Sequence, residues 1–260
     1  MGEIVSFSTG LSSAITAERV QQRFGKAEIV FCDTTIEHPD NYRFMEDVRE
    51  RWLREYGNDI TILKEGRDPF QLFEDKHIIP NSKIAPCTFT LKIDLFAKYV
   101  KPLKPSTIYI GYDYTEIHRF DATKRNWNEQ GFEVDFPLMW KPYEMRPYTH
   151  VCREDWGIEP PKMYELGYTH ANCGGRCVKQ GIGDWLRTLI NYPELYRMAE
   201  NWENEMRKHG KRKNYAILRE EKQKARIALP LSELRKRYEG KSQIQPELFD
   251  FESGCVHCGV

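Results

Sequence analysis

The chain has 260 residues, of which 40% are hydrophobic and 13% aromatic, and its 39 lysines and arginines equal its 39 aspartates and glutamates. The aromatic content excludes a disordered chain, and the zero net charge excludes a global attraction to nucleic acid or anionic lipid. No signal peptide precedes the first apolar run, and no segment has the roughly 20 apolar residues needed to cross a bilayer. We therefore expect a cytoplasmic protein with no membrane partner.

Strands and helices alternate along the first 140 residues. Short apolar runs rich in β-branched residues predict strands at 3–8, 27–34, 59–65 and 106–112. Helical spacing fills the intervals at 11–25, 39–57 and 91–100, and a polar helix is expected from about Thr115. The alternation predicts an α/β fold, a doubly wound parallel sheet covered on both faces.

The alternation weakens after residue 140. Proline-rich loops follow, and then helices are expected around 183–190, 193–210 and 229–240. We therefore expect two parts: an α/β core at 1–140 and a helical, cysteine-bearing C-terminal region at 141–260.

Small residues occupy the turn between the first strand and the first helix: Ser8, Thr9, Gly10, Ser12 and Ser13. Backbone amides and the positive helix end would face one point there, which suits an anion. The alternative is simple capping of the helix by a serine.

Five segments in order resemble the phosphoadenosine phosphosulfate (PAPS) reductase-like family of adenine nucleotide alpha hydrolases. FSTGLSS is similar to the SGGxDS loop of the PP-loop superfamily, and FCDTTIEHPDNYRF is similar to the family's second-strand segment. The other three are PCTFTLKI, GYDYTEIHR and LGYTHANCGGRCVKQG. The last of these, the PELYRMAENWE helix and the terminal cysteine pair look closest to a subgroup found in bacteria and phages.

The resemblance implies a site for an adenine nucleotide, which would be PAPS, adenosine phosphosulfate (APS) or ATP. The residues that would hold its phosphate or sulfate are Ser6, Ser8, Thr9, Gly10, Ser12 and Ser13. Asp33 and Thr34 would lie near the nucleotide, and Lys92, Glu116 and Arg119 would line the same cleft, with Lys92 and Arg119 in catalytic roles. The alternative for Glu116 and Arg119 is an ion pair on a helix surface.

One departure concerns metal chemistry. Ser12 stands where ATP pyrophosphatases carry the aspartate of SGGxDS, a residue associated with magnesium. Asp33 could supply a magnesium ligand instead. The change disfavours ATP-driven adenylation and fits the PAPS and APS reductase branch better.

Cysteines form the second chemical signal. Two close pairs, Cys173 with Cys177 and Cys255 with Cys258, favour a shared metal, although redox-active thiols and purely structural cysteines are alternatives. Cys87 resembles a cysteine that contributes to an iron–sulfur cluster in APS-type reductases. We expect a [4Fe–4S] cluster, with zinc as the alternative, and four ligands drawn from Cys87, Cys173, Cys177, Cys255 and Cys258. Cys32 and Cys152 are expected to be buried apolar residues.

The terminal SGCVHCGV segment is similar to the segment that holds the family's nucleophile. The resemblance implies that the Cys255 thiolate attacks sulfur and that a thioredoxin-like reductant completes the reaction.

Residues 207–226 contain nine lysines or arginines and two glutamates. This stretch is either a solvated surface or a contact for nucleic acid. Three functions therefore remain open: a PAPS reductase-like enzyme, an ATP-dependent sulfurtransferase that modifies tRNA or DNA, and a nucleotide-binding protein with a structural metal.

Overall fold

The computed structural model describes residues 2–222 and 225–239. These residues form two compact units, the first made of residues 2–65 and 90–162 and the second of residues 66–89 and 163–239. The second unit thus includes a segment from early in the chain. The division after residue 140 that the sequence suggests stays a prediction.

The first unit is built on a five-stranded parallel sheet with the strand order β3-β2-β1-β4-β5. Its strands are β1 (Glu3–Phe7), β2 (Glu28–Cys32), β3 (Ile60–Leu63), β4 (Thr107–Tyr109) and β5 (Val134–Asp135). The order reverses at β1, because the chain runs outward from β1 to β3 and then returns to place β4 on the other side of β1. The predicted doubly wound α/β fold is confirmed.

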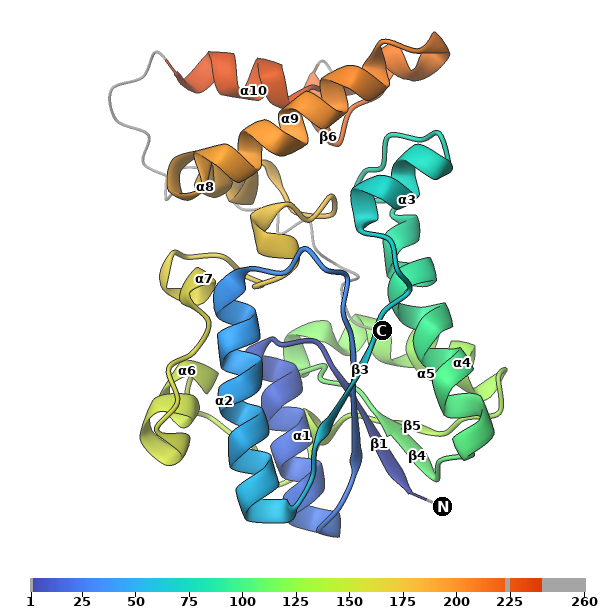
Figure 1. Cartoon of the computed structure of the whole chain (residues 1–260), viewed down its shortest axis with the longest axis vertical. Helices are drawn as coiled ribbons and strands as arrows, with labels where there is room; N and C mark the ends of the chain where they lie inside the picture. Colours follow the sequence, from blue (N-terminus) through green and yellow to red (C-terminus); the bar gives the residue numbers. More distant parts are fainter. Residues whose placement is uncertain (1, 223–224, 240–260) are drawn as a thin grey trace. The chain divides into compact units, whose positions relative to one another are not determined.

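Helices cover both faces of this sheet (Figure 1). They are α1 (Leu11–Phe24), α2 (Pro39–Tyr56), α4 (Asp94–Leu103), α5 (Phe120–Asn128) and α6 (Tyr148–His150). Single π- or 3₁₀-helical turns lie at Thr88–Ile93, Tyr114–Arg119, Pro137–Met139 and Val151–Asp155. Local sequence explains the bounds of α2: the His38 ring accepts a hydrogen bond from the Asp40 amide, and Gly57 ends the helix at φ 66°.

Alternate residues of the strands supply the two cores of the first unit, because successive side chains point to opposite faces. On one face Ile4, Val30 and Ile108 pack with Phe96 of α4 and Trp127 of α5. On the other face Phe7 of β1 packs edge-on against Phe31 of β2 and Trp52 of α2. Both faces are therefore apolar, as the near-continuous hydrophobic strands predict.

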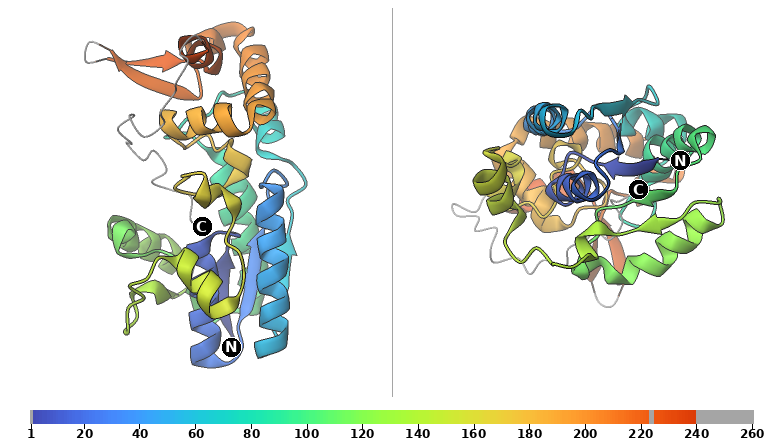
Figure 2. Two further views of the ribbon diagram at one scale, coloured as in Figure 1. Left: turned by 90° about the vertical axis from the view of Figure 1, so that its left-hand side faces the viewer. Right: turned by 90° about the horizontal axis from the view of Figure 1, so that it is seen from below.

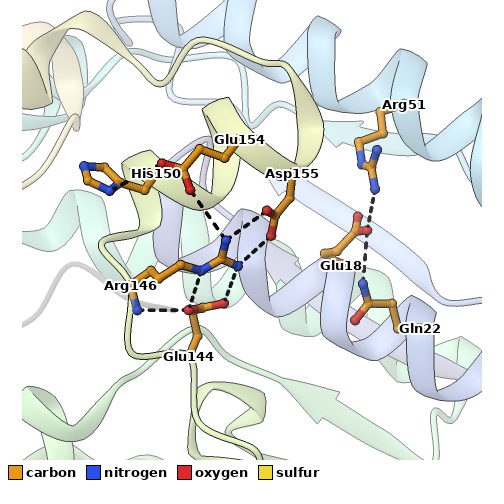
Figure 3. Close-up of polar contacts among 8 residues, drawn as sticks. All are labelled: Glu18, Gln22, Arg51, Glu144, Arg146, His150, Glu154 and Asp155. Carbon is orange, nitrogen blue, oxygen red and sulfur yellow. Dashed lines mark hydrogen bonds and ion pairs between the residues drawn. The ribbon is translucent and has the colours of Figure 1, made fainter.

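Two charged networks fix the helices of this unit (Figure 3). Glu18 of α1 is buried and accepts hydrogen bonds from Arg51, Trp52 and Tyr56. Arg146 donates to Glu144 and Asp155, and so ties the loop before α6 to the helical turn after it. These networks join elements to one another and lie outside the segments that resemble the nucleotide-binding family.

The second unit is mainly helical and has its own core. Its elements are α3 (Pro69–Asp75), α7 (Lys162–Glu165, whose first residue belongs to the first unit), a 3₁₀ turn (Cys173–Gly175), α8 (Ile182–Asn191), α9 (Pro193–Arg207), a 3₁₀ turn (Gly210–Asn214), the antiparallel strands β6 (Leu218–Lys222) and β7 (Ala225–Leu229), and α10 (Leu231–Tyr238). Phe73 of α3 shares one buried cluster with Trp185, Tyr196 and Leu231. That cluster explains why residues 66–89 join a unit formed mostly by the end of the chain.

Within the described part of the chain, none of the helices is both long enough and apolar enough to cross a membrane.

Candidate functional site

The serine-rich turn lies at the carboxyl end of β1 and leads directly into α1. Gly10 occupies the N-cap position and so offers no side chain to the helix. The Ser13 hydroxyl instead accepts a hydrogen bond from the Ser8 amide at 3.0 Å and donates to the Gly10 carbonyl at 2.9 Å. The hydroxyl groups thus shape the turn, and simple capping by a serine at the N-cap is not what the turn shows.

Thr9 gives this turn its sharp direction. It is fully buried, has a φ of 60°, and donates its hydroxyl to the Ser8 carbonyl at 2.7 Å. A threonine in left-handed backbone geometry is uncommon and costs energy, so it persists only where the surrounding structure holds it. The other two predicted residues surround the turn: Ser6 is buried in β1, and the Ser12 carbonyl accepts from Thr16 at 2.8 Å.

Gly111 brings the end of β4 against the same turn. A side chain at position 111 would place its Cβ 3.0 Å from the carbonyl carbon and oxygen of Ser12 and from the Ser13 Cα, so the backbone of the turn would have to shift to make room for it. β1 and β4 are neighbours on either side of the point where the strand order reverses. Open α/β sheets bind their ligands at this point, outside the carboxyl ends of the strands.

Asp33 follows β2 at the same edge of the sheet and is buried. Its carboxylate accepts hydrogen bonds from the Tyr42 hydroxyl at 2.6 Å and the Thr35 amide at 2.7 Å, and it lies 3.1 Å from the Lys64 ammonium. Burial, with the Asp33 carboxylate as the second cause, holds the pKa of Tyr42 well above its usual range. Tyr42 therefore stays protonated and acts as a fixed donor to Asp33.

The largely buried Lys92 and the buried Glu37 form a pair at this edge. The Lys92 ammonium lies 3.9 Å from a Glu37 carboxylate oxygen, and their side chains are 13% and 1% exposed. The same oxygen accepts a hydrogen bond from the Thr34 hydroxyl at 3.1 Å. The structure thus brings the predicted residues Thr34 and Lys92 together through Glu37, a residue that the sequence did not single out.

Two buried cysteines of this unit behave as apolar core residues. The Cys32 thiol donates to the Lys92 carbonyl at 3.6 Å. Burial raises the pKa of Cys32 and of Cys152 to about 12, so both thiols are protonated at neutral pH.

Arg119 and Glu116 are joined by a hydrogen-bonded ion pair, as the surface alternative expected, but Arg119 is buried. Its guanidinium lies 3.9 Å from the centre of the Tyr112 ring and donates to the Tyr112 hydroxyl at 2.6 Å. Its Nε is buried and has no hydrogen-bond partner among the described residues. The arginine is thus held below the surface after β4, and a role for it toward phosphate stays a prediction.

Cys173 and Cys177 lie in the second unit, both buried, in a turn of unusual backbone geometry. Cys173, Gly174 and Gly175 all have positive φ, and the Gly175 carbonyl accepts hydrogen bonds at 2.6 Å from Gln180 and from Thr188. Cys87 belongs to the same unit and packs against the cluster that contains Val178. No three His, Cys, Asp or Glu side chains in the described ranges are arranged to hold a metal ion.

Cys255 and Cys258 lie outside the described residues. The expectation that the serine-rich turn and the thiols meet at one nucleotide site therefore stays a prediction.

Sequence reasoning missed four partners of the predicted residues: Glu37, Tyr42, Lys64 and Tyr112. Glu37 and Tyr42 fall inside FCDTTIEHPDNYRF, a segment that resembles the family, so they could have been proposed as site residues from the sequence. Both are polar residues a few positions after the apolar strand β2, and this position is the signal that the sequence contains. Lys64 follows β3, and its pairing with Asp33 depends on the parallel register of β2 and β3, which the sequence does not state.

The fold and this edge define a class: a doubly wound α/β protein with a serine-rich turn and buried charged residues at its switch point. Among solved structures the chain is similar to a phosphoadenylyl-sulfate (PAPS) reductase from Candida auris, determined as a phosphate complex, with a TM-score of 0.42, 14% identity, and coverage of 65% of this chain and 79% of that chain. A likeness at this level identifies neither a family nor a substrate. No family model matches the sequence, and no curated protein matches it either.

Proposed function

We propose that this chain is a PAPS reductase-like enzyme that binds an adenine nucleotide at the carboxyl ends of β1, β2 and β4. The observation that carries the proposal is the meeting at one sheet edge of the serine-rich turn, Gly111 and the buried Lys92–Glu37 pair. A close backbone approach beside a helix N-terminus suits a phosphate or sulfate group, and a lysine supplies a point charge. The five segments that resemble the family occur in the same order.

Each group has a role in this proposal. The turn from Ser8 to Ser13 would hold a phosphate or sulfate oxygen through amides and hydroxyls. Lys92 would stabilise the negative charge that develops on the leaving phosphate, and Glu37 would hold the lysine until the anion arrives. Asp33 and Thr34 would contact the nucleotide. Asp33 is also the candidate magnesium ligand, although Tyr42 and Lys64 already bind its carboxylate.

The proposed reaction is a two-step reduction at sulfur. The Cys255 thiolate attacks the sulfate sulfur of PAPS, so that an S–S bond forms while the S–O bond to the phosphate breaks and adenosine 3′,5′-bisphosphate leaves. A thioredoxin-like dithiol then reduces the cysteine S-sulfonate. Sulfite is released, the Cys255 thiol is restored, and the dithiol becomes a disulfide.

Thiolates would hold the proposed [4Fe–4S] cluster or zinc ion. Cys173 and Cys177 fit such a role, because both are buried and their turn is held by Gln180 and Thr188. Cys87 and Cys258 would supply the remaining two ligands, which leaves the Cys255 thiolate free to act as the nucleophile. The bound group would hold the four thiolates together and so stabilise the fold around them.

The test combines turnover with binding. Purified chain, prepared without oxygen, is assayed for sulfite release from PAPS and from APS with thioredoxin, and for pyrophosphate or AMP release from ATP with and without RNA or DNA. We expect sulfite release, and we expect Lys92→Gln to weaken nucleotide binding in calorimetry tenfold or more. Lys98→Gln is the matched control, because Lys98 is an exposed lysine of α4 that pairs with Asp94.

Other outcomes would contradict the proposal. ATP turnover that depends on added nucleic acid would favour the sulfurtransferase function, and nucleotide binding without turnover would favour a binding protein. If Lys92→Gln and Lys98→Gln bind the nucleotide with equal affinity, the proposal that the nucleotide binds at this sheet edge is wrong.

A further inference from the structure

The basic segment, residues 207–226, belongs to the second unit and contains none of the residues that the proposed function uses. It contains the end of α9, the 3₁₀ turn Gly210–Asn214, β6 and the start of β7. Residues 223 and 224 lie outside the described part of the chain. Besides Lys208, which pairs with Glu205, five basic side chains of the segment are exposed: Lys211, Lys213, Arg219, Lys222 and Arg226. The segment therefore presents its charge to solvent.

Two nearby acids pair with residues other than these five, and a third, Glu221, lies opposite Arg226 in the hairpin. Glu205 pairs with Lys208 at 2.6 Å, and Glu220 pairs with Arg237 of α10 through two hydrogen bonds of 2.6 and 2.9 Å. Within residues 2–222 and 225–239, none of the five exposed basic side chains makes an ion pair. The contrast with α2 is plain, since Arg43 and Arg49 there bind acidic neighbours on both sides.

β6 and β7 form an antiparallel hairpin (Figure 2). In its register Arg219 lies opposite Ala228, Arg226 opposite Glu221 and Lys222 opposite Ala225. Arg219 and Arg226 therefore share one face of the hairpin, and Lys222 lies on the other. The preceding turn adds Lys211 and Lys213.

An exposed aromatic ring lies within the same stretch. Tyr215 is 46% exposed and follows directly on the basic turn. Its backbone is held, because Arg207 donates to its carbonyl oxygen, and the ring itself faces solvent. Basic side chains that track phosphates, together with an aromatic ring on which an unpaired base can stack, are the recognition elements of single-stranded nucleic acid.

We propose that the basic segment is a binding surface for single-stranded nucleic acid. Phosphates would contact Lys211 and Lys213 of the turn and Arg219 and Arg226 on one face of the hairpin, and one base would stack on Tyr215. The surface is independent of the nucleotide site in the first unit, so either proposal can fail while the other stands.

The test is fluorescence anisotropy with a labelled single-stranded oligonucleotide of about 20 nucleotides, titrated at several salt concentrations. The variant Lys211→Glu/Lys213→Glu/Arg219→Glu should bind at least tenfold more weakly. Its slope of log affinity against log salt should be smaller by about 2, since each lost phosphate contact on a single strand contributes about 0.7. Tyr215→Ala should weaken binding about fivefold or more without changing that slope.

The matched control reverses three exposed basic residues of the first unit, Lys26→Glu/Lys101→Glu/Arg125→Glu, and leaves the net charge the same as in the test variant. Thermal unfolding of both variants checks the fold, and Lys211→Gln/Lys213→Gln replaces the triple variant if that one unfolds. Equal loss of binding in the test and control variants would overturn the proposal. So would binding to vesicles of anionic lipid without binding to the oligonucleotide, which would mark a membrane-binding surface.

Discussion

Glu37 in the first unit and Glu203 in the second are both buried acids, yet their partners differ in kind. Glu37 faces side chains, namely the Thr34 hydroxyl and the Lys92 ammonium. Glu203 of α9 accepts hydrogen bonds from two backbone amides, those of Ile217 and Leu231, both at 2.7 Å. Side chains can exchange a partner for a ligand, whereas the two amides mark fixed points of the chain. The comparison suggests that Glu37 serves binding and Glu203 serves folding.

The largest effect is expected from Glu203→Ala. Two buried amides would lose their acceptor, and each such loss costs about 1–3 kcal/mol, so the free energy of unfolding should fall by about 2–6 kcal/mol. Urea denaturation measures it. Glu205→Ala is the control, because Glu205 makes an exposed pair with Lys208 and should matter by less than about 0.5 kcal/mol. Similar losses for the two variants would refute the structural role of Glu203.

Glu37→Gln should reduce stability less, by about 1–3 kcal/mol. The amide keeps an oxygen for the Thr34 hydroxyl but removes the negative charge that lies 3.9 Å from the largely buried Lys92 ammonium. An anionic nucleotide should restore part of this loss, so thermal shift with PAPS should be larger for the variant than for the unaltered chain. Glu203→Ala should show no such gain. If PAPS raises the melting temperature of Glu37→Gln and of Glu203→Ala by the same amount, the proposed difference between the two acids is wrong.

Tyr42→Phe should cost about 1 kcal/mol, because it removes one hydrogen bond to Asp33 while the Thr35 amide and Lys64 remain. Urea denaturation gives the stability, and calorimetry with PAPS should show weaker binding if Tyr42 orients Asp33 toward the nucleotide. Unchanged binding would confine Tyr42 to a structural role.

The smallest effect is expected in the pH dependence of the free energy of unfolding. Burial raises the pKa of Glu203 above its ordinary value of 4.5, and the two amide hydrogen bonds oppose this shift only in part. The folded chain therefore keeps this proton at pH values where the unfolded chain has lost it. The protonated Glu203 carboxyl contributes fully to the free energy of unfolding below its ordinary pKa. This contribution disappears as the pH rises through the pKa of Glu203 in the folded chain. Compared with Glu203→Gln by urea denaturation, the unaltered chain should lose stability over that rise, and parallel curves would contradict the shift.

Much of the first unit follows from local pattern. The strands at β1, β2, β3 and β4 and the helices α1, α2 and α4 lie where hydrophobic spacing predicts them, because parallel strands buried on both faces are continuous apolar runs. β5 has only two residues, Val134–Asp135, too short for any periodicity. The hairpin of β6 and β7 could not be predicted for another reason. Most of its residues are exposed or charged, so the sequence lacks the apolar alternation that is typical of a strand.

The site was less predictable than the fold. The serine-rich turn could be placed from the sequence, since a strand, small residues and a helix follow one another within a few positions. The buried pairing of Lys92 with Glu37 could not, because 55 residues separate them and only the return of the chain to the sheet edge brings them together. Distant pairings of this kind depend on topology, which a single sequence states only indirectly.

The composition of the second unit has a consequence for synthesis on the ribosome. Phe73 and Ile79 emerge early, yet their buried neighbours Trp185 and Tyr196 are made more than 100 residues later. Until then the apolar side chains of α3 are exposed, and they promote aggregation of the nascent chain or its binding by chaperones. A nascent chain halted near residue 140 would display that surface indefinitely, so truncated products should be poorly soluble even when their sheet is complete.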